Sequence, residues 1–185
     1  ALRADVVLIG EEHDNTAAQA LAADLWDDIL AVYEQSSSNT LAPALCLEFF
    51  ERDEQLIIDD YLAGVIDTEA SFKRDAGRTA GNYPEGHRRM LEAAKAAGVP
   101  VIGANVPRRY ANYARREGFD PLRDLTAERR AMFTLPEPPA LPDLPDYRAR
   151  FDAVMRPMLE QHGGSSPEAI EGLYRGQILK DATMA

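Results

Sequence analysis

The sequence of 185 residues predicts an α/β domain with a mainly parallel sheet flanked by helices. Three short apolar runs, 6–9, 44–47 and 99–104, are typical of buried parallel strands. The stretch between the first two, 16–33, has the apolar spacing of an amphipathic helix. Strands that alternate with helices indicate parallel pairing through right-handed crossovers, and the length suits one hydrophobic core.

The first predicted strand ends at Gly10 and leads through a polar loop into the first helix. Asn15 or Thr16 can cap that helix, because both side chains can accept a hydrogen bond from a backbone N–H of the first turn. Apolar residues recur every four positions along the helix, which predicts one face turned toward the core. The residues of this face are Leu21, Leu25, Ile29 and Tyr33.

The connection between the second and third strands, about 53–98, is much longer than the dozen or so residues that a crossover requires. We therefore expect a helical subdomain inserted before the third strand, within a single α/β domain that spans 1–185. Inside it, 55–62 has a helical pattern. The stretch 77–86 contains three glycines and a proline and predicts an irregular loop.

After the third strand, Pro107 suits the first turn of a helix that should end at Gly118. The stretch 135–145 is rich in prolines and acids and predicts an extended surface segment. Helical patterns resume at 147–159 and 167–185.

Composition argues against nucleic acid as a partner. The chain has 20 Lys and Arg residues against 31 Asp and Glu, a net charge of -11, which repels phosphate backbones and anionic lipid surfaces. A single cysteine, Cys46, rules out a disulfide within the chain. No apolar stretch approaches the roughly 20 residues of a membrane span.

Polar residues follow each predicted strand. Because ligands collect at the carboxyl ends of parallel strands, these residues are expected to gather at one edge of the sheet. They are Glu11, Glu12, His13 and Asp14, then Glu48 and Glu51, then Asn105 and Arg108. Glu11, His13 and Glu48 could hold a divalent metal ion or act as general acid and base. Alternatively, such residues only cap helices and solvate loops.

Tyr83 and His87 lie four residues apart and would share a face if that stretch were helical. Haem iron accepts either side chain as an axial ligand, so the pair suits haem better than zinc. The alternative is that Tyr83 is a packing residue and His87 a surface residue.

Two pairs of arginines, Arg88-Arg89 and Arg108-Arg109, are the basic groups nearest to the predicted site. Arg88, Arg108 and Arg109 could bind the two propionates of haem through bidentate hydrogen bonds. Equally, they could only balance neighbouring carboxylates on solvated helix faces.

Four segments, taken together and in order, carry a resemblance to a known family. They read VLIGEEHDN at 7–15, LEFFERDEQ at 47–55, NVPRRYA at 105–111 and QILKDATMA at 177–185. On these segments the chain resembles the ChaN-like haem-binding lipoproteins. That family belongs to a superfamily that also includes erythromycin esterases and Tiki-type metalloproteases, whose Gly-Glu-x-His loop is matched by Gly10, Glu11 and His13.

The resemblance implies an α/β domain with a small helical subdomain and a homodimer that binds haem with a Tyr ligand on iron. It also implies location at the bacterial periplasm or outer membrane as a lipoprotein, with membrane association only through a lipid anchor absent from this sequence. It also implies that the fold continues beyond Ala185, so we expect the C-terminal part of the family fold to be missing here. His87 stands where the family has Tyr in Tyr-x-Pro-Leu, and Arg89 replaces the Pro. This departure leaves three alternatives open: ligation of iron by His87, ligation of iron by Tyr83, or loss of haem binding.

Three functions are compatible with these observations, the third being a haem-free protein interaction module that binds neither haem nor a metal ion. The first is a haem- or iron-binding protein of the bacterial envelope that takes part in haem or iron uptake, is not an enzyme, and uses Tyr83, His87, Arg88, Arg108 and Arg109. The second is a metal-dependent hydrolase in which Glu11, His13 and Glu48 hold a divalent metal ion or activate water.

Overall fold

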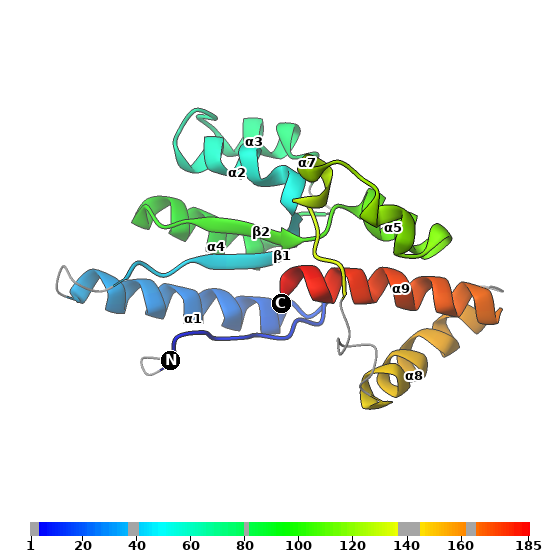
Figure 1. Ribbon diagram of the computed structural model, residues 1–185. Coiled ribbons are helices and arrows are strands. Elements are labelled where there is room, and N and C mark those ends of the chain that lie inside the picture. Colours follow the sequence, from blue (N-terminus) through cyan, green and yellow to red (C-terminus); the bar gives the residue numbers. More distant parts are fainter. Residues whose placement is uncertain (1–3, 37–40, 80–81, 137–144, 162–165) are drawn as a thin grey trace. The chain divides into compact units, whose positions relative to one another are not determined.

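The computed structural model describes residues 4–36, 41–79, 82–136, 145–161 and 166–185. Its helices flank a small parallel sheet of two strands, β1 (Leu45–Glu51) and β2 (Val101–Asn105), which confirms the predicted fold class (Figure 1). The chain divides into two compact units. The first contains 1–49 and 54–103, and the second contains 50–53 and 104–185.

The first unit holds four α-helices among its described residues. They are α1 (Thr16–Gln35), α2 (Gln55–Leu62), α3 (Glu69–Asp75) and α4 (Glu85–Ala97). A single 3-10 turn, η1 (Arg52–Glu54), precedes α2. The helix predicted at 55–62 is thus confirmed.

Helices α1 and α4 pack closely against each other and form the core of the first unit. Trp26 and Leu30 from α1 are buried with Met90 and Leu91 from α4. The indole Nε1 of Trp26 donates a hydrogen bond to the carbonyl of Met90 at 3.2 Å, so this large side chain is buried with its polar atom satisfied. Burial of each such apolar side chain contributes about 1.5–3 kcal/mol.

Gly86 is the point of closest approach between these two helices. A Cβ atom at this position would lie 2.8 Å from both the Cβ and the carbonyl oxygen of Gln19. Only glycine therefore lets α4 come this near to α1, and the contact sets the position of His87, the next residue.

The predicted apolar face of the first helix is only partly right. Leu25, Ile29 and Tyr33 are half-buried and Leu21 is exposed. The fully buried stripe runs through Gln19, Ala23, Trp26 and Leu30. The indole is the largest group available, and α1 is turned so that this ring meets α4. A count of every fourth apolar residue misses this stripe, because its members are three or four positions apart and its first member is polar.

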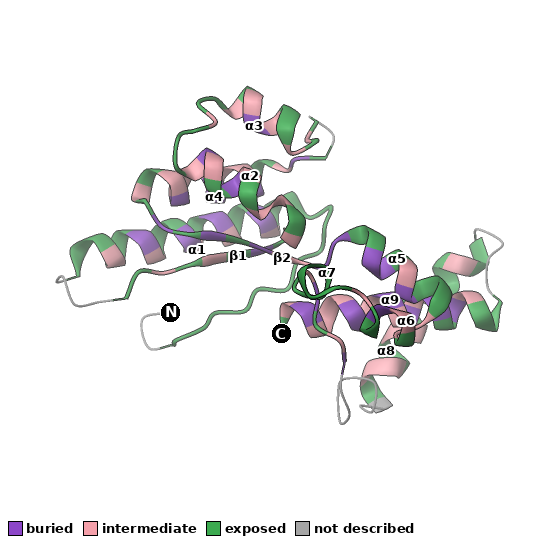
Figure 2. Cartoon of the chain, turned by 45° about the horizontal axis from the view of Figure 1, so that its top comes forward, coloured by how far each residue is buried: buried purple, intermediate pink, exposed green. Residues whose placement is uncertain are grey.

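The strand predicted at 6–9 is also wrong. Val6, Val7, Leu8 and Ile9 are not in a strand, and their exposed fractions range from 42% to 91%. Figure 2 shows this N-terminal segment as exposed up to the start of α1. Within the described part of the chain these four residues make no backbone hydrogen bond. β-branched residues favour a strand through packing on neighbouring strands, and the two strands among the described residues, β1 and β2, pair with each other rather than with this segment.

The other boundaries shift in three places. β1 extends to Glu51, so Glu48 and Glu51 lie within the strand rather than after it. Glu48 occupies the exposed side of the strand, where a charge does not end pairing. β2 begins at Val101, and the loop predicted at 77–86 ends at Pro84, because α4 starts at the next residue.

The second unit holds five α-helices among its described residues. They are α5 (Arg108–Glu117), α6 (Asp120–Arg123), α7 (Ala127–Arg130), α8 (Pro145–Gln161) and α9 (Pro167–Met184). The helix predicted between Pro107 and Gly118 is confirmed, with those two residues at its ends. The later helices are confirmed as well, while most of the segment predicted to be extended, 137–144, lies outside the described residues.

Close packing of α5 on α9 forms the core of the second unit. A Cβ atom at Gly172 would lie 2.8 Å from the carbonyl oxygen of Arg115, so the backbones almost touch there. Tyr110, Ala114 and Leu179 are buried along this contact. None of the described helices has both the length and the apolar character needed to cross a membrane.

Candidate functional site

The loop that precedes α1 is held by its own side chains. The Asn15 side chain caps the helix by accepting a hydrogen bond from the N–H of Ala18 at 3.0 Å. The same side chain donates to a carboxylate oxygen of Glu12 at 3.3 Å. This confirms Asn15 as the cap and fixes the direction in which the loop enters the helix.

Glu11 is the centre of the polar cluster in the first unit. One of its carboxylate oxygens lies 2.6 Å from Nε2 of His87, and the other lies 3.2 Å from Nδ1 of His13. The Gln19 side chain donates to Glu11 at 3.1 Å and to the carbonyl of His13 at 2.7 Å. One carboxylate therefore contacts two imidazoles, and the buried amide of Gln19 donates a hydrogen bond to the same carboxylate.

The charge of this carboxylate is stabilised by its neighbours. Burial alone would raise the pKa of Glu11, but the hydrogen bond and electrostatic interaction with His87, together with hydrogen bonds from His13 and Gln19, lower it below the ordinary value. Glu11 is consequently ionised at neutral pH and can only accept hydrogen bonds. It follows that Nε2 of His87 carries a hydrogen.

Tyr83 and His87 lie together, although not in the way that their spacing suggested. Tyr83 precedes α4, whose N-cap is Pro84, so the two residues do not share a helix face. Both rings instead contact Phe49 at the end of β1, with centroid distances of 5.7 Å for Tyr83 and 4.5 Å for His87. The predicted pair is brought together by a residue from another part of the chain.

Both side chains are buried, with exposed fractions of 6% for Tyr83 and 4% for His87. Within the described residues, the hydroxyl of Tyr83 and Nδ1 of His87 have no hydrogen-bond partner. Burial, and then the negative charge of Glu92, raise the pKa of Tyr83 above its ordinary value, so its phenol is neutral at physiological pH.

His13 differs from His87 in its accessibility. Its side chain is 77% exposed and lies at the rim of a shallow depression of about 440 Å³. The residues that line this depression are Glu12, His13, Asp14, Asn15, Thr16 and Ala17.

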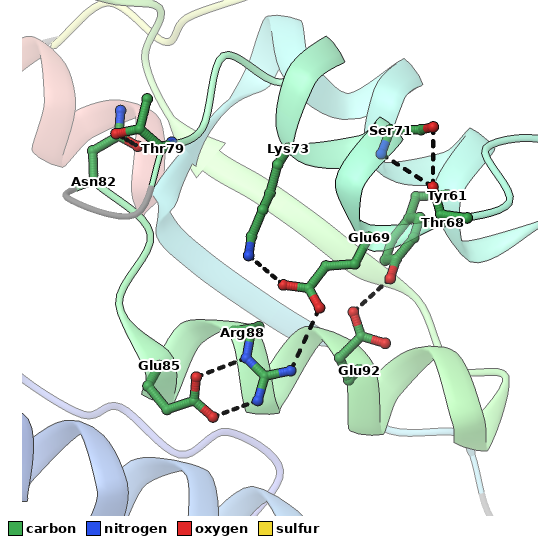
Figure 3. Close-up of polar contacts among 10 residues, drawn as sticks. All are labelled: Tyr61, Thr68, Glu69, Ser71, Lys73, Thr79, Asn82, Glu85, Arg88 and Glu92. Atoms are coloured by element: carbon green, nitrogen blue, oxygen red, sulfur yellow. Dashed lines mark hydrogen bonds and ion pairs between the residues drawn. The ribbon is translucent and has the colours of Figure 1, made fainter.

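Arg88 is already paired with two carboxylates in the first unit. Its guanidinium donates to Glu85 at 2.7 and 2.5 Å, and it lies 3.6 Å from Glu69 of α3 (Figure 3). Glu69 also pairs with Lys73 at 2.5 Å. This predicted propionate-binding residue is therefore part of a network that joins α3 to α4.

Arg108 and Arg109 belong to the second unit. The backbone N–H of Arg108 donates to Glu51 at 2.8 Å, while the Arg108 side chain is largely exposed. The Arg109 guanidinium donates to Asp53. Both arginines thus have acidic neighbours, as the alternative interpretation of the basic pairs expected.

The predicted metal ligands are only partly assembled. Glu11 and His13 are in contact, but Glu48 is on the exposed side of β1. Across the described ranges, no group of three or more His, Cys, Asp and Glu side chains is arranged to hold a metal ion.

Sequence reasoning missed two residues of this site, Gln19 and Phe49. Gln19 gave a weak signal, because it occupies a buried-stripe position four residues before Ala23. Phe49 lay within the segment that carried the family resemblance, but its contacts with residues more than thirty positions away leave no local pattern.

Comparison with known proteins identifies the family. The family model described as haem-binding uptake, Tiki superfamily, ChaN matches residues 1–185, and the chain therefore belongs to this family. No curated protein and no solved structure matches the chain.

Proposed function

We propose that this member of the haem-binding uptake family binds haem in its first unit, with Tyr83 and His87 as the ligands of iron. The observation that carries the proposal is the pair of buried ligand atoms without partners, the hydroxyl of Tyr83 and Nδ1 of His87. Haem iron takes both kinds of side chain as axial ligands. The two residues therefore fit the group that the family name implies.

Leaving polar atoms buried and unpaired is costly. Each such group destabilises the fold by about 1–3 kcal/mol, and native proteins contain few of them. Here two occur on rings that contact one residue, Phe49. A ligand that bonds to either atom recovers part of that cost, which favours a binding role over simple packing.

Glu11 prepares His87 for such a role. Because the ionised carboxylate accepts from Nε2, the neutral imidazole must carry its lone pair on Nδ1, the unpaired nitrogen. A carboxylate on the far nitrogen of a histidine ligand fixes the tautomer and makes the ring a stronger donor. Glu11 is a positioning residue in this proposal.

Tyr83 would bind as a phenolate and must first lose its proton. Burial raises the pKa of Tyr83, so the neutral phenol is the resting form. When bound, ferric haem would supply the positive charge that favours the phenolate. Ligation through Tyr83 would therefore release a proton and strengthen as pH rises.

Arg88 is the proposed partner of a haem propionate in this unit, because a guanidinium binds a carboxylate through two parallel hydrogen bonds. It already does so with Glu85.

We also propose a place for the protein at the envelope of a bacterium, as a lipoprotein and a homodimer that serves haem or iron uptake. The family description, haem-binding uptake, supports this role.

A comparison of haemin with iron-free protoporphyrin IX tests the proposal. The two probes share their ring and propionates and differ in the metal. We expect haemin to bind saturably with a shifted Soret band and far more tightly than the iron-free ring. Equal affinity for both would contradict ligation of iron, and absence of haemin binding would contradict the proposed function.

A further inference from the structure

The proposed ligand Tyr83 is covered by α3, the helix Glu69–Asp75. Phe72, at the centre of α3, is fully buried, with its ring 4.5 Å from that of Tyr61 and 6.2 Å from that of Tyr83. The ammonium group of Lys73 lies 5.5 Å from the centroid of the Tyr83 ring. A planar ligand as large as haem can reach the Tyr83 hydroxyl only if this cover moves.

The segment that covers Tyr83 is flanked by two glycines whose backbone φ is positive. Gly64, just after α2, has φ of 77°, and Gly77, just after α3, has φ of 63°. Glycine populates positive and negative φ about equally, so the backbone at these two positions is freer to rotate than it would be at a residue with a side chain. We name the intervening residues, 65–76, the α3 cap.

One ion pair links the α3 cap to the helix that carries His87. Glu69 of the cap lies 3.6 Å from Arg88 of α4 (Figure 3). Each side chain is 33% exposed, so the pair is partly screened by solvent. Arg88 keeps a second partner, Glu85, on its own helix, which means that it need not lose all its hydrogen bonds when the cap moves.

We propose that the α3 cap is a gate over Tyr83. In the closed state Glu69 pairs with Arg88, and we call this ion pair the latch. The cap opens when a carboxylate of the ligand replaces Glu69 as the partner of Arg88. The inference rests on the proposed function, and it adds the mode of entry and its trigger. The ligand class that it selects is a planar amphipathic ring with carboxylate arms. The carboxylate of such a ligand would displace Glu69 from Arg88, and its apolar ring would meet the aromatic rings of Phe72 and Tyr83.

The chain provides a matched pair of variants to test the gate. Glu69→Gln removes the partner of Arg88 on the cap, and Glu85→Gln removes its partner on α4, with the same change in charge and shape. Hydrogen exchange of the amides of 65–76 in the ligand-free protein is measured first. We expect faster exchange in the Glu69→Gln variant and wild-type exchange in the Glu85→Gln variant. Equal exchange rates of 65–76 in the two variants would contradict the proposal that the pair between Glu69 and Arg88 holds the cap closed.

The association rate of haemin is the second measurement, taken by stopped flow with an excess of haemin. If opening limits entry, the apparent rate follows the open fraction, and loss of a partly exposed ion pair should raise it about two- to five-fold. The wild type is the reference for this rate, because Glu85 binds the guanidinium of Arg88 and its replacement would itself change how Arg88 meets a carboxylate. A rate that is unchanged or lower in Glu69→Gln would overturn the gate.

The two measurements separate this inference from the proposed function. Faster exchange of 65–76 in Glu69→Gln, together with no haemin binding by any of the proteins, would support the latch and contradict haem binding. Haemin binding by the Glu69→Gln variant at the wild-type rate would support haem binding and contradict the gate.

Discussion

The carboxylate of Glu11 lies 2.6 Å from Nε2 of His87, although 76 positions separate the two residues in the chain. This contact joins the loop before α1 to the first turn of α4. It is possible because Gly86 lets the two helices come close. The loop that carries the family motif thereby acts on the imidazole that we propose as an iron ligand.

Replacement of Glu11 by Gln should weaken haemin binding. The amide cannot supply the negative charge that holds the hydrogen on Nε2 of His87, and changes to such outer partners typically cost about 10- to 100-fold in affinity. Titration with haemin measures the effect. Glu12→Gln, one residue away, is the control: its exposed carboxylate accepts a hydrogen bond from the Asn15 side chain and does not contact His87, so this variant should bind as the wild type does.

Stability should fall in acid through Glu11. Its pKa in the folded protein is lowered from the ordinary 4.5, so the stabilisation that it provides is complete above about pH 4.5 and is lost as pH falls through the lower folded value. We expect the difference in unfolding free energy between wild type and Glu11→Gln to shrink as the pH drops below 4.5. Urea denaturation at a series of pH values checks this. A difference that stays constant, or grows in acid, would show that the carboxylate is not stabilised by its neighbours.

Gly86→Ala should destabilise the first unit. The added methyl group would lie 2.8 Å from the carbonyl oxygen of Gln19, which belongs to a helix and cannot move alone. Overpacking of this kind costs about 1–3 kcal/mol. Chemical denaturation provides the measurement. Gly10→Ala is a suitable control, because no atom lies within 4 Å of its added methyl group, and it should leave stability almost unchanged.

Tyr83→Phe should leave the ligand-free protein as stable as the wild type, or make it more stable. The hydroxyl that is removed is buried and has no partner among the described residues, so its loss forfeits no hydrogen bond. Tyr61→Phe provides the contrast, since the Tyr61 hydroxyl donates to Glu92 at 2.5 Å (Figure 3), and its loss should destabilise by about 1 kcal/mol. Thermal unfolding of both variants decides the matter. A clear loss of stability in Tyr83→Phe would mean that its hydroxyl has a structural partner.

The fold class could be predicted from the sequence because two apolar runs and the helices around them carry strong local patterns. The strand at 6–9 could not be judged in the same way, since its side chains have strand propensity whether or not a neighbouring strand is present. The buried stripe of α1 was misplaced because Trp26 and the polar Gln19 define it, rather than the regularly spaced leucines.

Sequence reasoning named residues of the candidate site, but it did not predict how they contact one another. Glu11, His13, Tyr83 and His87 were all named from residue type and motif, and all four lie in the first unit. The contact between Glu11 and His87, and the part of Phe49 in joining Tyr83 to His87, depend on packing between distant segments. Such contacts leave no periodic signal in a single sequence.

The central claim is that Tyr83 and His87 bind the iron of haem. Its most direct test is the dissociation constant for haemin of the double variant Tyr83→Phe/His87→Gln, measured beside the wild type and the folded control Tyr61→Phe. Loss of both ligands should weaken binding by more than about 100-fold, beyond the effect of an outer partner, while the control binds like the wild type. A double variant that binds haemin as tightly as the wild type, with the same Soret spectrum, would contradict the claim.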